Sequence, residues 1–312
     1  MKISKNDSAF NRSRFLIITA IITVLAVIAQ ACTPAPQETD APPENTPLPP
    51  SPSSTPVPQP TVTPTLALID EGIVFLVVGL SPDQTLPIYH EPSLSALQTG
   101  QIPGAGKNIR TTGNAHENDG LQWLQIEYQG SGGWVDYAHL ASQKGDLPEA
   151  LVELAQSAAL AIKGAVYSDL GEIIHPDLCL RFSPYPFLRD GDQIFCPEQL
   201  SSLPGSSTLY LWGKFDGTGE PIELSFDDYH QRFVYDQDFS QPAVVGLNQE
   251  VSSGNAINNI PEIYPDGMIV EYHFPGFEPQ YVGMDWRSLR MVFIQEGGEW
   301  FLVALVHGEW TI

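Results

Sequence analysis

The stretch "SLRMVFIQEGGEWFLVALVHGEW" (residues 288–310) decides the fold expected for the C-terminal part of the chain. Two runs rich in aliphatic and aromatic residues flank a Gly-Gly pair, which is the pattern of a β-hairpin with a short turn. The segment "GMIVEYHF" (267–274) precedes them and reads as a further strand. The chain is therefore expected to end in a meander of antiparallel strands.

A helical pattern comes before this meander, in "GDLPEALVELAQSAALAIKGAVYSD" (145–169). Asp146 and Glu149 have the spacing of a capping box at the helix start. One apolar stripe at helical spacing is expected in the core: Leu151, Leu154, Ala155, Ala158 and Ile162. A helix early and strands late predict an α+β domain over 146–312, with helices packed on a bent antiparallel sheet.

Residues 67–145 have a different character. "LQWLQIEYQGSGGWVDYAHLAS" (121–142) gives two alternating strands around a glycine-rich turn, and "GIVFLVVGL" (72–80) is β-branched and apolar. Several short strands without a long helix predict a small all-β barrel. The parts "QWLQIEY" and "GGWVDYAHL" resemble the closing hairpin of bacterial SH3-like domains, which implies a binding or spacing module of an exported protein.

The C-terminal part carries a second resemblance. "HPDLCLRFSPYPF" (175–187), "MDWRSLRMVF" (284–293) and "GEWFLVALVHGEWT" (298–311) are similar to a widespread family of bacterial secreted proteins that lacks an assigned activity. More weakly, this part resembles the cystatin-like, nuclear-transport-factor-type cone. Such a cone implies a pocket that some relatives use for catalysis and many use only for binding.

The N-terminal region has the pattern of an export signal. Residues 1–14 carry four basic side chains and one acidic one, and Phe15–Ala29 is an uncharged apolar run of 15 residues, which is short for a spanning helix. With Cys32 directly after Ala31, residues 1–31 resemble a bacterial lipoprotein signal peptide, which implies lipid on Cys32. An ordinary signal peptide cut near Ala31 and an uncleaved N-terminal anchor are the alternatives.

A proline-rich segment follows this signal. Residues 33–66 contain 12 prolines and little that is apolar. Proline interrupts helices and sheet ladders, and a segment with so little to bury does not form a core. Residues 32–66 are therefore expected to be a disordered Pro/Thr-rich stalk.

The charge balance excludes one class of partner. Residues 1–31 hold four of the 14 basic and one of the 37 acidic side chains, so the rest carries 10 and 36, a net charge of −26. A nucleic-acid binder needs clustered cations, and these ten are scattered. The expected partners are the membrane, through the lipid, and the cell wall or an envelope protein, in an extracytoplasmic location. No motif indicates a metal or another cofactor.

Cys179 and Cys196 are the two cysteines that remain after Cys32. An exported location favours a disulfide between them. Two buried free thiols are the alternative.

The candidate chemistry lies on the strand at 267–274. Glu271 and His273 share one face of it and would form an acid–base pair if that face lined a pocket, with His307 joining them across the sheet. The alternative is that these side chains are solvated or are buried and hydrogen-bonded for structure. We therefore expect a noncatalytic binding or envelope-scaffolding protein. The alternative is an enzyme or small-ligand binder that uses a cone-shaped pocket with Glu271 and His273.

Overall fold

The computed structural model describes residues 69–311, except residues 71 and 253. The predicted signal peptide (1–31), the lipid site at Cys32 and the predicted stalk (32–66) lie outside the described residues. Within the described part, no helix combines the length and the apolar character needed to cross a bilayer.

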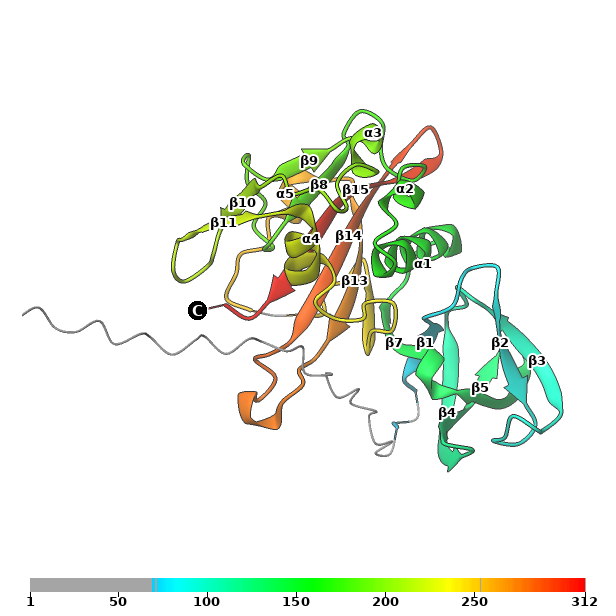
Figure 1. Cartoon of the computed structure of the whole chain (residues 1–312). Helices are drawn as coiled ribbons and strands as arrows, with labels where there is room; N and C mark the ends of the chain where they lie inside the picture. The colour runs from blue at the N-terminus through cyan, green and yellow to red at the C-terminus, as the bar shows by residue number, and fades with distance from the viewer. Residues whose placement is uncertain (1–68, 71, 253, 312) are drawn as a thin grey trace, which may run out of the picture. The chain divides into compact units, whose positions relative to one another are not determined.

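One mixed sheet of thirteen strands dominates the described chain (Figure 1). Its strand order is β3-β2-β6-β5-β4-β1-β7-β12-β13-β14-β15-β8-β9. The first seven strands of the sequence are β1 (Val74–Val77), β2 (Thr85–Tyr89), β3 (Gln98–Pro103), β4 (Ile109–Asn118), β5 (Leu121–Tyr128), β6 (Ser131–Asp136) and β7 (Leu140–Gly145). The other six are β8 (Leu180–Ser183), β9 (Gln193–Phe195), β12 (Val244–Leu247), β13 (Met268–Phe274), β14 (Arg287–Glu296) and β15 (Glu299–Glu309).

The other elements are small. Strands β10 (Tyr210–Lys214) and β11 (Pro221–Leu224) form a separate two-stranded sheet. The helix α1 (Glu149–Lys163) has 15 residues. The remaining helices are single turns: α2 (Tyr167–Leu170), α3 (Pro197–Leu200), α4 (Phe226–Tyr229), α5 (Ile260–Ile263), η1 (Tyr137–His139), η2 (His230–Val234) and η3 (Pro279–Tyr281).

This architecture shows that the predicted fold class was wrong. No separate SH3-like barrel is evident over 67–145, because β1–β7 form one flank of the large sheet. The expected α+β domain with helices packed on an antiparallel sheet is not shown either. Only α1 exceeds a few residues, and the sheet is mixed, since β7 pairs with β12 and β8 with β15 in parallel. Strand patterns in a sequence are local, whereas the β7–β12 pairing joins Ser142 to Val244.

Two hydrophobic clusters share the strand β1. Phe75 and Val77 pack into a cluster with residues of β2–β7, whereas Leu76 and Val78 pack into the larger cluster that contains α1. This division follows from the alternation of side chains along a strand. Strand β7 divides in the same way, with Leu140 in the first cluster and Ala141 in the second.

The helix α1 is present where the apolar stripe predicted it. Leu151, Ala155, Ala158 and Ile162 are buried, with Leu154 packed at the edge of the cluster. The predicted capping box is absent, because Pro148 is the N-cap and makes no side-chain hydrogen bond. The carboxylate of Asp146 instead pairs with Lys107.

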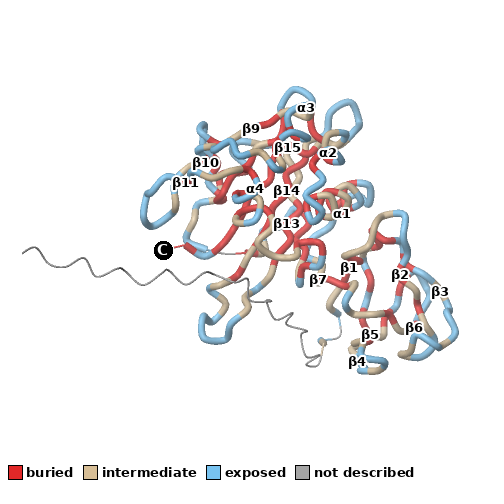
Figure 2. Tube along the Cα trace, viewed as in Figure 1, coloured by how far each residue is buried: buried red, intermediate tan, exposed pale blue. Residues whose placement is uncertain are grey.

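The strands β13, β14 and β15 lie side by side and are buried along most of their length (Figure 2). One face of this trio contributes Val270, Leu289 and Leu305 to the larger cluster. The other face holds a third, small cluster that includes Val292 and Val306. Glu271, His273, Ser288 and Arg290 also lie on this second face.

Candidate functional site

Four polar side chains meet on adjacent strands. The register between β13 and β14 places Glu271 opposite Arg290 and His273 opposite Ser288. Residues two apart on a strand share a face, so all four side chains point to the same side of the sheet. All four are buried. The sequence prediction that Glu271 and His273 share a face agrees with this arrangement.

Glu271 is surrounded by hydrogen-bond donors. Its carboxylate accepts bonds from the backbone N–H of Val251 (2.9 Å) and of Ser252 (3.1 Å), and from the Ser288 hydroxyl (2.8 Å). The Ser252 hydroxyl donates a further bond, and a guanidinium nitrogen of Arg290 lies 3.3 Å away. Burial by itself would raise the pKa of Glu271, but Arg290 and these hydrogen bonds outweigh it and lower the pKa.

The proton on Ser288 fixes the tautomer of His273. The carboxylate of Glu271 is an acceptor only, so the Ser288 hydroxyl must donate its one hydrogen to it. The Nδ1 atom of His273 lies 2.8 Å from the same hydroxyl oxygen and therefore carries the hydrogen of that bond. Burial, with a smaller effect of Arg290, lowers the pKa of His273 against the opposing effect of Glu271. His273 is thus neutral near pH 7, with its lone pair on Nε2.

His273 lies at a surface cavity of about 320 Å³. The segment after β12 contributes Ser252, the loop between β13 and β14 contributes Val282 and Met284, and the strand ends contribute Trp286 and Trp310. The ring of Trp286 packs against that of His273, with centroids 5.9 Å apart. Glu271 does not line the cavity. The cavity therefore combines polar groups, among them His273 and Ser252, with the apolar side chains of Val282, Met284, Trp286 and Trp310.

The loop between β13 and β14, orange in Figure 1, has a defined conformation. The carboxylate of Asp285 accepts hydrogen bonds from the backbone N–H of Phe277 (3.1 Å) and of Glu278 (2.8 Å). Gly276 has φ +134°, and a Cβ there would lie 2.8 Å from the Cα of Gly283. These contacts hold the part of the loop that forms the cavity wall.

Val282 adopts a left-handed backbone conformation, with φ 52°. This conformation is an outlier for a β-branched residue, and such strain persists only where the surroundings impose it. The side chain of Val282 is exposed at the cavity.

The third candidate, His307, does not join the pair. It lies opposite Leu289 on β14, so its side chain points to the other face of the sheet from His273. There its ring contacts the carbonyl oxygen of Pro184 (3.3 Å) and the carboxylate of Asp236 (3.1 Å). The expectation that His307 completes a site with Glu271 and His273 was wrong.

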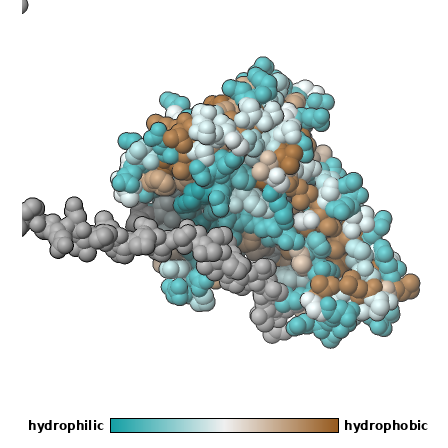
Figure 3. Space-filling view, in the orientation of Figure 1, coloured by the Kyte–Doolittle hydropathy of each residue, from teal (hydrophilic) through white to brown (hydrophobic). Residues whose placement is uncertain are grey.

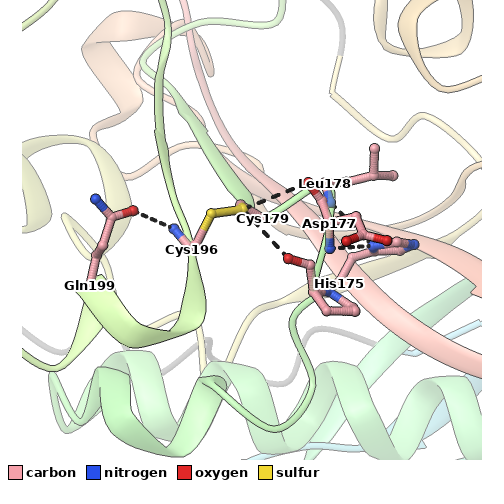
Figure 4. Close-up of a disulfide and its surroundings, with 7 residues drawn as sticks. His175, Asp177, Leu178, Cys179, Cys196 and Gln199 are labelled. Atoms are coloured by element: carbon pink, nitrogen blue, oxygen red, sulfur yellow. Dashed lines mark hydrogen bonds between the residues drawn. A yellow bond between two sulfur atoms is a disulfide. The ribbon is translucent and has the colours of Figure 1, made fainter.

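The disulfide between Cys179 and Cys196 is present, as predicted (Figure 4). It joins the residue before β8 to the residue after β9, and these two strands also pair with each other. The bridge closes the loop at the edge of the sheet and takes no part in the cavity. The expectation of a disulfide in place of two thiols is confirmed.

Sequence reasoning did not identify Trp286, Ser288 or Arg290 as members of one site. Their spacing could have indicated it, because residues at alternate positions along a strand point to the same face of the sheet. Ser252 had no such signal, because its position depends on how the segment after β12 returns to β13. No group of three or more His, Cys, Asp or Glu side chains within the described residues could hold a metal ion.

A scan against models of known protein families gives no match, and a search of curated proteins likewise finds none that matches this sequence.

Proposed function

We propose that the chain is a noncatalytic extracytoplasmic binding protein, held at the membrane by lipid on Cys32, that takes its ligand in the cavity at His273. The observation that carries the proposal is the imidazole of His273, hydrogen-bonded to Ser288 and lining a cavity that also presents apolar side chains. The Nδ1 atom of His273 is hydrogen-bonded to Ser288, so its Nε2 atom is the one that can accept a hydrogen bond from a ligand.

An enzyme that uses Glu271 and His273 as an acid–base pair is the other candidate, and the geometry supports it less well. Glu271 does not line the cavity, and its carboxylate accepts hydrogen bonds from the hydroxyls of Ser252 and Ser288. Its pKa is lowered, so it holds no proton to give near neutral pH. A group with this environment orients its neighbours and does not exchange protons with a ligand.

The face of the molecule shown in Figure 3 favours a local ligand site over a broad apolar interface. On the uncovered part of the face shown in Figure 3, hydrophobic residues form small areas separated by hydrophilic ones. A large continuous apolar patch on a surface marks a protein or membrane interaction site. Cell-wall material and envelope components are the candidate sources of the ligand.

The test compares full chains, purified in mild detergent, for capture of purified cell wall and of envelope extract. Trp310 lines the cavity and is 42 % exposed, so Trp310→Ala removes part of the wall with little effect on the core. Leu209, which is 60 % exposed and does not line the cavity, provides the control Leu209→Ala. Capture by the unchanged chain and the control, but not by Trp310→Ala, is expected. No enrichment of either material would contradict the proposal.

The membrane attachment has its own test. Mass spectrometry of the native protein should find residues 1–31 removed and Cys32 acylated. An unmodified Cys32, or a retained leader, would refute this part of the proposal.

A further inference from the structure

We propose that the ligand of the cavity is a neutral, hydroxyl-bearing ring of the saccharide type, which donates a hydrogen bond to Nε2 of His273 and packs against Trp310. This inference rests on the proposed binding function and names the chemistry of the ligand.

The cavity lining excludes a charged ligand. Its nine lining residues include no Asp, Glu, Lys or Arg. His273 itself is neutral near pH 7, and the charges of Glu271 and Arg290 are paired with each other behind the lining. A carboxylate, phosphate or ammonium group would lose hydration on entering and would find no counter-charge there.

The polar part of the lining requires a hydrogen-bond donor on the ligand. Nε2 of His273 is an acceptor, because the hydrogen is on Nδ1. A ligand without a donor would cover this nitrogen and leave it unpaired, at a penalty typical of buried polar groups. A hydroxyl group supplies this donor.

The apolar side chains that line the cavity favour an apolar surface on the same ligand. Trp286 is 6 % exposed and forms part of the inner wall, while Met284, Val282 and Trp310 are more exposed at the cavity. Burying apolar ligand surface against these side chains is favourable. A pyranose ring combines the two demands, since its C–H faces are apolar and its edge carries hydroxyl groups.

The experiment titrates the full chain in detergent with sugars that differ in charge and follows tryptophan fluorescence. The neutral probes are N-acetylglucosamine and methyl glucoside, the cationic probe is glucosamine, and the anionic probe is glucuronate. We expect the neutral probes to bind at least tenfold more tightly than both charged ones. Trp310→Ala should weaken binding of the neutral probes at least tenfold, and Leu209→Ala should leave it unchanged.

Three results would overturn the inference. The first is equal or tighter binding of glucosamine or glucuronate. The second is no saturable change with any sugar up to about 10 mM, a concentration at which a ligand with a Kd of about 1 mM is mostly bound. The third is binding that Trp310→Ala does not weaken.

Failure of the saccharide inference is distinguishable from failure of the binding function. If envelope capture depends on Trp310 but no sugar competes with it, the cavity binds a ligand of other chemistry. If capture itself is absent, the binding function fails as well.

Discussion

Glu271→Gln removes the negative charge from the centre of the buried network while keeping the size of the side chain. Arg290 is 2 % exposed and, among the described residues, would then have only Glu250 as a charged partner, at 3.5 Å. Its Nε and Nη1 atoms already have no hydrogen-bond partner among the described residues. Removing one member of a buried ion pair leaves the other charge uncompensated, and the loss is about 3–5 kcal/mol in the free energy of unfolding.

Urea unfolding at pH 7, followed by tryptophan fluorescence with the disulfide intact, measures this loss. The matched control is Glu250→Gln, which removes the other carboxylate near Arg290. Glu250 is 52 % exposed, so its loss should lower the free energy of unfolding by about 0–1 kcal/mol. The double variant Glu271→Gln/Arg290→Met should be more stable than Glu271→Gln alone, because it removes the unpaired charge. A loss below about 1 kcal/mol for Glu271→Gln, or equal losses for the two glutamates, would refute the reasoning.

Three other changes test separate parts of the structure. Replacing Cys179 and Cys196 by serine opens a loop with a sequence separation of 17 and should lower the free energy of unfolding by about 3 kcal/mol; an unchanged urea midpoint would contradict this. Because the pKa of His273 is lowered in the folded state, the unfolded chain binds the proton more readily, so stability should fall as the pH drops from about 6.5 toward that lowered pKa. His273→Gln should flatten this dependence in a pH series of urea midpoints, and an identical slope would exclude His273 as its source. Gly276→Ala places a Cβ 2.8 Å from the Cα of Gly283 at a φ of +134°, so a loss of about 1–3 kcal/mol in urea unfolding is expected, against no loss if the loop adapts freely.

Individual helices and strands could be predicted from the sequence, but the pairing of strands that lie far apart in the chain could not. The stripe of α1 and the alternation of β13 are periodic patterns, which report which side chains share a face. The parallel contact of β7 with β12 has no such signal, because about a hundred residues separate Ser142 from Val244. For that reason strands were predicted where β1, β5, β6, β13, β14 and β15 occur, whereas β3, β4, β8, β9, β12 and the sheet that the strands build were not predicted.

The candidate site divides in the same way. The shared face of Glu271 and His273 was predictable from their spacing on one strand. The position of His307 was not, because it depends on the register that pairs it with Leu289. The role of Glu271 also depended on distant segments, since Ser252 and Ser288 supply the hydroxyls that hold its charge.

The sharing of β1 between two clusters has a consequence for how the molecule can be divided. A fragment that ends at Gly145 would expose Leu76 and Val78 to solvent. A fragment that begins after Gly145 would lack these two residues in its hydrophobic core. Neither fragment is therefore expected to fold stably alone, and we expect the two parts to unfold together in a single cooperative transition.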